Sequence, residues 1–200
     1  MTKFQDTGRP IAEEFFNAVR EDSKDGRGVS RQGYGPHEEF VHDWVKAAGK
    51  RMGMEIEIDP AGNLWMTRPG KNRALPAIVP GSHGDSVPEG GNYDGLAGVC
   101  AALTVAEMLH KENVQLERDF TMLVTRMEES SWFGRAYVGS LALTGKLKPS
   151  EIQLRHRNTN ETLADTIRKC GFDPDVMVSG KVLKDLSNIA AFIELHIEQG

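Results

Sequence analysis

The stretch from residue 75 to residue 125 constrains the fold more than any other part of the chain. Residues 75–82 are a short apolar run, residues 96–110 carry apolar side chains at helical spacing, and residues 120–125 are again almost continuously apolar. A strand, a helix and a second strand in this order predict a parallel crossover, because parallel strands need a long connection. Pro80 lacks an amide hydrogen, so we expect the first strand to end or bulge there.

Periodicity predicts further helices and strands around this unit. The helices are expected over residues 11–22, 36–53 and 162–169, and the strands over residues 54–59, 64–67 and 190–197. The first two of these strands are separated by Pro60-Ala61-Gly62-Asn63, a turn sequence that predicts a hairpin. The order of elements therefore indicates an α/β fold with a mixed, largely parallel sheet flanked by helices.

Composition excludes several classes of protein. The chain is 39% hydrophobic and 26% charged, which is typical of a globular chain with a packed core. A net charge of −5 argues against nucleic acid as a partner. The sequence has neither a secretory signal nor an apolar span long enough for a membrane, so we expect a cytoplasmic protein. Cys100 and Cys170 lie far apart and are expected to be reduced thiols.

Ionisable residues gather at or near the carboxyl ends of the predicted strands, where open α/β sheets bind ligands. The clusters are Gly81–Ser86 with Asn92–Gly95, Glu128-Glu129, and Glu194–Gln199. Imidazole and carboxylate groups together suit zinc, manganese or cobalt. The candidate ligands are His83, Asp94, Glu129 and His196.

Spacing within the clusters suggests which side chains bind metal, which support a ligand and which act as a base. In an extended His-x-Asp segment the two side chains point to the same side, so Asp85 is expected to orient or polarise the His83 imidazole. Neighbouring residues point to opposite sides, so one carboxylate of Glu128-Glu129 can bind metal while the other acts as a general base.

Each cluster also has a simpler explanation. A lone histidine after a strand usually makes a structural hydrogen bond, and two adjacent glutamates usually form a solvated turn. The glycine-rich loop before residue 96 could hold a phosphate, but Asp94 would repel an anion and the spacing matches neither nucleotide-binding motif. Because the clusters follow successive strands, a metal site is the better explanation. For His37, His42, His110 and His156 we expect surface or structural roles.

Taken together, the motifs GSHGDS, GGNYDGLAGV, EESSWFG and ELHIEQG resemble the hydantoinase/carbamoylase branch of the M20 metallohydrolases. That branch includes N-carbamoyl-L-amino acid hydrolases, allantoate amidohydrolases and β-ureidopropionases. The match is collinear from about residue 11 to residue 200. The resemblance implies that residues 1–200 are the amino-terminal part of a phosphorylase/hydrolase-like metallohydrolase catalytic domain.

The resemblance also implies roles for individual residues. The implied ligands of two divalent ions (zinc, manganese, cobalt or nickel) are Asp94 bridging both, His83 and His196 on one ion, and Glu129 on the other. Glu128 is implied as the base that activates the bridging water, and the candidate catalytic residues are Glu128 together with Asp85, which the His-x-Asp spacing already indicates. Gln199 matches a position that contacts substrate.

The implied reaction is hydrolysis of the carbamoyl C–N bond of N-carbamoyl-L-amino acids or related ureido acids, such as allantoate and β-ureidopropionate, with release of ammonia and carbon dioxide. Members of the branch carry a lid and dimerisation domain after ELHIEQG and then the rest of the catalytic domain. We therefore expect a homodimeric parent whose lid, second-metal histidine and substrate-binding arginine lie beyond residue 200.

Two alternatives stay open. One is an aminoacylase or exopeptidase of the wider M20 group, although such enzymes usually carry a carboxylate where this chain has His196. The other is a truncated chain that binds metal or a partner without turnover.

Overall fold

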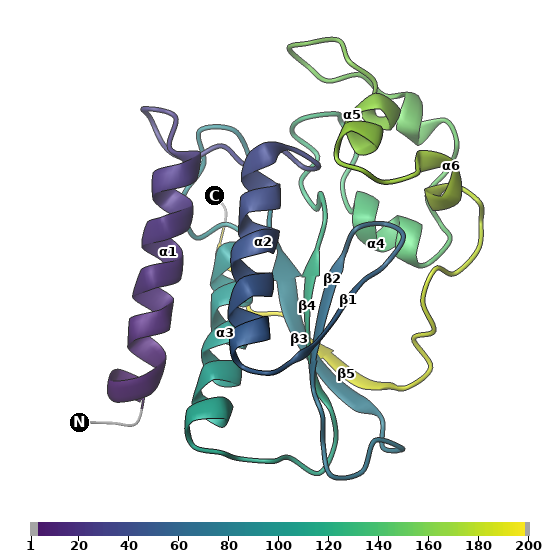
Figure 1. Ribbon diagram of the computed structural model, residues 1–200. Coiled ribbons are helices and arrows are strands. Elements are labelled where there is room, and N and C mark those ends of the chain that lie inside the picture. Colours follow the sequence, from purple (N-terminus) through teal and green to yellow (C-terminus); the bar gives the residue numbers. More distant parts are fainter. Residues whose placement is uncertain (1–3, 199–200) are drawn as a thin grey trace.

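The computed structural model of the protein describes residues 4–198 (Figure 1). Its helices are η1 (Phe4–Gly8, a π-helix), α1 (Arg9–Ser23), α2 (Pro36–Arg51), α3 (Leu96–Lys111), α4 (Val138–Leu143), η2 (Glu151–Gln153, a 3₁₀-helix), α5 (Leu163–Lys169) and α6 (Pro174–Met177). Its strands are β1 (Glu55–Ile58), β2 (Leu64–Arg68), β3 (Ala77–His83), β4 (Phe120–Thr125) and β5 (Ile189–Ile193). None of the helices in this part of the chain has the length and apolar character that a bilayer span requires.

The strands form one mixed sheet in the order β1-β2-β4-β3-β5. Antiparallel pairing joins β1 to β2 and β2 to β4, whereas β4 with β3 and β3 with β5 are parallel. The predicted hairpin and the predicted crossover through α3 are therefore both confirmed. The α/β class and the mixed sheet flanked by helices are confirmed as well.

The prediction for Pro80 was wrong, because β3 continues through it to His83. Ile78 donates to the carbonyl of Asp119, so the nitrogen two residues later also faces the β4 side. The Cα pairing with β4 resumes at Gly81. The proline thus removes a hydrogen bond within the ladder, and the pairs on either side keep the strand extended.

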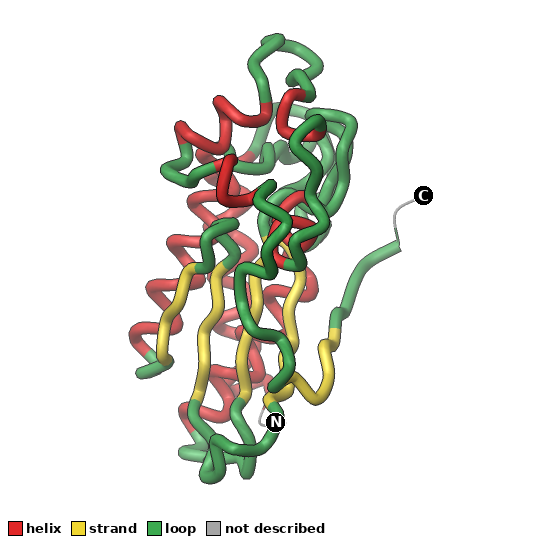
Figure 2. Tube along the Cα trace, turned by 90° about the vertical axis from the view of Figure 1, so that its right-hand side faces the viewer, coloured by secondary structure: helices red, strands yellow, loops and turns green. Residues whose placement is uncertain are grey.

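Helices α2 and α3 cover one face of the sheet, α1 packs against both of these helices, and Figure 2 shows them behind the strands. Side chains alternate along the strands, so Leu64 and Met66 of β2 join the core beneath these helices, while Trp65 faces the opposite side. There Trp65 packs with Leu123 of β4 and Leu143 of α4. The larger core thus lies under α1–α3 and holds β2 and β4, whereas Val79 of β3 packs on the opposite face with Trp65.

A second core lies around α4, α5 and the segment that follows β4. It contains Trp132, Phe133 and Ile167, all buried. The predicted helix over 162–169 begins after Thr162, whose side chain accepts a hydrogen bond from the amide of Asp165. Helices α4, α6 and η2 were not predicted, because each is too short to show a periodic pattern.

Asp59 holds the hairpin turn. The turn includes Asn63, which binds the backbone of the site described below. The buried carboxylate of Asp59 accepts from the amides of Ala61 and Asn63, at 2.9 and 3.1 Å, and from Trp65 Nε1 at 2.9 Å. It also accepts from Asn63 Nδ2 at 2.9 Å. One short acidic side chain therefore satisfies donors on both sides of the turn.

Replacement of Asp59 by alanine is expected to lower the free energy of unfolding by about 2–4 kcal/mol, because buried donors lose their acceptor. The matched control is Asp43→Ala, which removes an exposed carboxylate paired with Lys46 and should cost less than about 0.5 kcal/mol. Urea denaturation followed by tryptophan fluorescence measures both. Equal midpoints for the two variants would show that the turn does not depend on Asp59.

Candidate metal centre

Four segments that are distant in sequence meet at the carboxyl ends of β3, β4 and β5. His83 ends β3, and its Nε2 lies 3.0 Å from Nε2 of His196, which follows β5. Asp94 Oδ1 lies 3.7 Å from His83 Nε2 and 3.9 Å from His196 Nε2. Glu128, beyond the end of β4, places Oε2 3.9 Å from His83 Nε2. The candidate ligand atoms predicted from sequence thus converge on one small volume.

Asp85 fixes the orientation of His83. The Nδ1 of His83 lies 3.1 Å from Asp85 Oδ1, and both side chains are fully buried. This is the contact expected from the His-x-Asp spacing. Burial lowers the pKa of His83, but the hydrogen bond and charge of Asp85, with the charges of Glu128 and Asp94, outweigh this and raise it to about 9. The other ring nitrogen is left directed at His196.

The same Asp85 carboxylate also holds the two glutamates. Its Oδ1 and Oδ2 accept hydrogen bonds from the amides of Glu128 and Glu129, each at 3.0 Å. Burial raises the pKa of Asp85, yet the contacts with His83 and the two amides outweigh it and hold the pKa below its usual range. One buried anion therefore connects the ends of β3 and β4.

Asp94 lies in the loop before α3, where the backbone is tightly packed. Its Oδ2 accepts from the amide of Val87 at 3.1 Å, while Oδ1 is buried without a hydrogen-bond partner. The next residue, Gly95, has a φ of +64°, and a Cβ there would lie 2.5 Å from the carbonyl oxygen of His83. Only glycine allows the loop to approach His83 this closely.

The half-buried side chain of Glu128 lies among other charged groups of the site. Burial raises the pKa of Glu128, and the charges of Glu129 and Asp85 add to this, while His83 and His196 oppose it. A raised carboxyl pKa suits a group that must take up and release a proton near neutral pH. Oxygens of both glutamates lie close enough to a nitrogen of His83 to share one ion with it.

The donor set fits a divalent cation. Within the described residues, His83 with Asp94 and His196 form one group of possible ligands, and His83 with Glu128 and Glu129 form a second. A buried carboxylate oxygen without a partner, facing two imidazole nitrogens, is an energetic cost that a cation would remove. Nitrogen and oxygen donors in this combination match zinc and its first-row neighbours.

Sequence reasoning missed several residues that support the site. Arg31 is fully buried and donates from Nε to the carbonyl of Gly84 at 3.0 Å and from Nη2 to that of Asp94 at 2.8 Å, so it joins the two ends of the loop. Ser82 Oγ donates to Glu194 Oε1 at 2.6 Å and ties the segment after β5 to β3. No spacing pattern marks Arg31, because its partners are backbone carbonyls.

The remaining histidines are placed apart from these groups. His37 pairs with Asp22 at 2.8 Å, and His156 stacks on Trp132. His42 is buried in α2, and its Nε2 has no hydrogen-bond partner. Gln199, implied as a substrate contact, lies outside the described residues.

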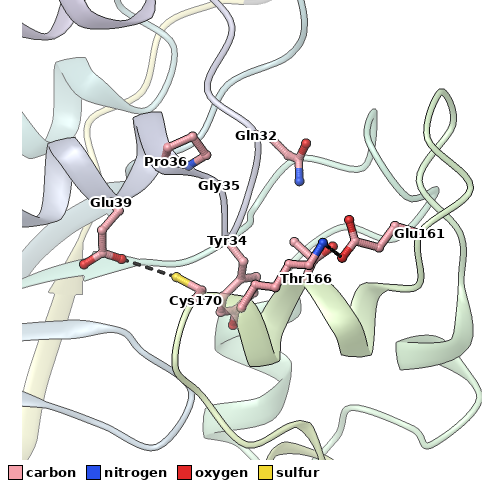
Figure 3. A pocket seen from close by; sticks show the side chains of 9 residues that line it. Gln32, Tyr34, Gly35, Pro36, Glu39, Glu161, Thr166 and Cys170 are labelled. Carbon is pink, nitrogen blue, oxygen red and sulfur yellow. Dashed lines mark hydrogen bonds and ion pairs between the residues drawn. The ribbon is translucent and has the colours of Figure 1, made fainter.

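A cavity of about 420 Å³ lies between the start of α2 and the end of α5, and none of the candidate ligands lines it (Figure 3). Its lining includes Tyr34, Glu39, Lys169 and Cys170, and Cys170 Sγ donates to Glu39 Oε2 at 3.3 Å. Its residues offer no cluster of metal donors, so the site is defined by the converging side chains and not by this hollow.

Substitution of Gly95 by alanine is expected to displace His83, since the new Cβ would meet both its carbonyl and its ring. The positive φ adds about 1–2 kcal/mol of strain, which corresponds to a fall of at least about 2 °C in the melting temperature. The control is Gly91→Ala, where a Cβ meets nothing within 4 Å. Calorimetry that found both variants as stable as the parent would contradict the tight approach.

Removal of the His83 imidazole by His83→Ala is expected to lower the amount of bound divalent metal, because the ring belongs to both ligand groups. His196→Ala should do the same, whereas His110→Ala, at an exposed position of α3, should not. Elemental analysis of desalted protein gives metal equivalents per chain. If all three variants keep the parental content, the ligand set is wrong.

Comparison with known proteins gives matches over most of the chain. It is 32% identical over 161 residues to an N-carbamoyl-L-amino-acid amidohydrolase of Pseudomonas sp. (strain NS671), covering 80% of this chain and 38% of that protein. It is 32% identical over 156 residues to an allantoate amidohydrolase of Bacillus subtilis (strain 168), covering 78% of this chain and 37% of that protein. The chain thus spans less than half the length of these relatives.

Comparison of the fold with solved structures finds the same group of enzymes. The crystal structure of a hydantoinase/carbamoylase family amidase from Burkholderia ambifaria superposes with a TM-score of 0.77 at 26% identity, covering 96% of this chain and 46% of that one. A family model for Peptidase family M28 matches residues 63–160, which include the crossover and the first two clusters. Sequence and fold therefore agree that the chain is similar to the amidases of the hydantoinase/carbamoylase family over most of its length.

Proposed function

We propose that the chain is the amino-terminal part of a metal-dependent amidohydrolase that cleaves the carbamoyl C–N bond of N-carbamoyl-L-amino acids or related ureido acids. The observation that carries this proposal is the convergence of His83, Asp94, His196 and the Glu128-Glu129 pair at one end of the sheet. The names of the two curated relatives, an N-carbamoyl-L-amino-acid amidohydrolase and an allantoate amidohydrolase, support the choice of substrate class.

In this proposal two divalent cations (zinc, manganese, cobalt or nickel) share the site. Asp94 would bridge them, with His83 and His196 on one and Glu129 on the other. When bound, such cations lower the pKa of a shared water and polarise the ureido carbonyl. The unpartnered Oδ1 of Asp94 supports a ligand role for this carboxylate, and Oδ2, which accepts from the amide of Val87, keeps a second lone pair for the other cation.

Glu128 would transfer the proton. Its half-buried carboxylate takes a proton from the attacking water, whose oxygen forms the new bond to the ureido carbon. As the C–N bond breaks, Glu128 returns that proton to the departing nitrogen. The carbamate released in this way decomposes to ammonia and carbon dioxide. Asp85 holds His83 and the amide of Glu128 during these steps and so keeps the base and the ligand in register.

We assign residues 1–200 to the first part of the catalytic domain. The lid and dimerisation domain and the remainder of the catalytic domain would supply the distal ligand of the second cation and the group that binds the substrate carboxylate. Gln199 would contact substrate, and the parent enzyme would be a cytoplasmic homodimer.

A peptidase is the second candidate, and the match to the Peptidase family M28 model favours it. The two activities differ in their products, because hydrolysis of a peptide or an N-acetyl amino acid gives no ammonia. An assay of the full-length protein with N-carbamoyl amino acids, allantoate, N-acetyl amino acids and dipeptides therefore separates them. Ammonia from the ureido acids alone supports the amidohydrolase, and turnover of dipeptides alone would replace it by the peptidase.

Exchange of Glu128 for glutamine is expected to lower kcat of the full-length protein by about 10²- to 10⁴-fold, since the amide cannot accept the proton. Metal content should stay at the parental level if Glu129, and not Glu128, is the ligand. Ammonia release and elemental analysis on the same preparation test both statements, with the exposed Glu14→Gln as control. Parental turnover in Glu128→Gln would remove this residue from the mechanism.

A further inference from the structure

The segment that carries the two glutamates is held by four consecutive backbone amides. Each of them donates to a buried side chain from elsewhere in the chain: Arg126 N to Asn63 Oδ1 at 2.9 Å, Met127 N to Glu38 Oε1 at 2.7 Å, Glu128 N to Asp85 Oδ1 at 3.0 Å and Glu129 N to Asp85 Oδ2 at 3.0 Å. The three acceptor residues are fully buried. The direction of the two glutamates is therefore set by acceptors outside their own strand.

The carbonyl groups of the same segment are satisfied as well. The carbonyls of residues 126, 127 and 128 accept from the amides of residues 139, 138 and 137, at 3.0, 2.9 and 2.8 Å. Met127 has a φ of +45°, a conformation that costs a residue with a Cβ about 1 kcal/mol or more. Such a conformation persists only where its surroundings enforce it.

Glu38 is the acceptor that enforces it. Its Oε1 binds the Met127 amide, while its Oε2 accepts from the amide of Tyr34 at 2.7 Å and from Arg126 Nη1 at 3.1 Å. Burial raises the pKa of Glu38 to about 7, against the opposing charge of Arg126. A carboxylate kept in so unfavourable a place, which joins the amide of Tyr34 to the amide of Met127 and also binds Arg126, points to a role in holding the turn at Met127.

We propose that Glu38 is a positioning residue of the metal centre, which acts by holding the Met127 amide and so directs Glu128 and Glu129 toward His83. The catalytic consequence rests on the proposed function. The expected effect on the backbone does not depend on the proposed function, because every contact that carries it lies within the protein itself.

Two substitutions at Glu38 test the proposal. Glutamine keeps the shape, and its oxygen is expected at the Oε2 position, where it satisfies the two donors Tyr34 N and Arg126 Nη1, so that its NH₂ group turns toward the Met127 amide. Aspartate keeps the charge that Arg126 needs, but its shorter side chain withdraws the carboxylate from the Met127 amide. The matched control is Glu39→Gln, because Glu39 also binds Arg126, through Nη2 at 2.6 Å, whereas the amides of residues 127–129 donate to Glu38 and Asp85.

The first measurement is amide hydrogen exchange across residues 126–129 of the metal-free protein. Loss of a hydrogen bond to a buried charge should speed exchange at Met127 by about 10- to 100-fold in Glu38→Gln and Glu38→Asp, and leave it within about twofold in Glu39→Gln. Parental exchange at Met127 in a folded Glu38 variant would overturn the proposal. Equal acceleration in Glu39→Gln would overturn it too, because the charge balance of Arg126 would then explain the effect. If Glu38→Gln fails to fold, Glu38→Asp decides.

The second measurement uses the metal-loaded full-length protein. We expect kcat for the ureido acid to fall in both Glu38 variants with KM unchanged, and the visible spectrum of the cobalt-loaded protein to shift, because the glutamates change direction. An unchanged spectrum and kcat alongside faster exchange would overturn the catalytic part. If the parental protein hydrolyses no ureido acid but the Glu38 variants show the expected faster exchange, the proposed function is refuted. The role of Glu38 in holding the turn is then retained.

Discussion

The contact on which the site depends is the burial of the Asp85 carboxylate between β3 and β4. One oxygen faces the ring of His83, and the two oxygens together accept the amides of Glu128 and Glu129. A buried carboxylate is tolerable only when such donors surround it, so the requirement to satisfy this anion fixes the spacing of both strand ends. Parallel pairing of β3 with β4 then brings His83 opposite Thr125, three residues before the acid pair. The sheet brings the strand ends together, and Asp85 sets the orientation of His83 and of the Glu128-Glu129 backbone.

The electrostatic balance of the site follows from this construction. Three carboxylates, of Asp85, Asp94 and Glu128, act on His83 and together make a protonated imidazole favourable even in a buried place. These carboxylates outnumber the imidazoles of His83 and His196 beside them, and Arg31 donates its hydrogen bonds to the backbone carbonyls of Gly84 and Asp94, so an excess of negative charge is left. A site of this kind attracts cations, and the same excess repels free carboxylates. An acidic substrate would therefore need a compensating charge from outside these segments.

Much of the architecture could be predicted from the sequence, and the reasons differ from part to part. The crossover and the hairpin followed from apolar runs and a turn sequence, because the period of side-chain burial is local information. The His-x-Asp contact followed from strand geometry for the same reason. Pro80 misled, because the cost of one lost ladder hydrogen bond depends on the neighbouring pairs, which sequence does not display. Arg31 escaped notice because its partners are backbone carbonyls more than fifty positions away. Glu38 escaped notice because its contact with the Met127 amide likewise joins residues far apart in the sequence.

His196 differs from the other members of the site in how it is supported. It follows β5, which pairs only with β3 among the described strands, and its side chain is about one-third exposed, whereas those of His83 and Asp94 are buried. On the proposed ligand set, a bound cation would tie this less buried residue to His83 and Asp94 and would thereby stabilise the segment after β5 against local opening.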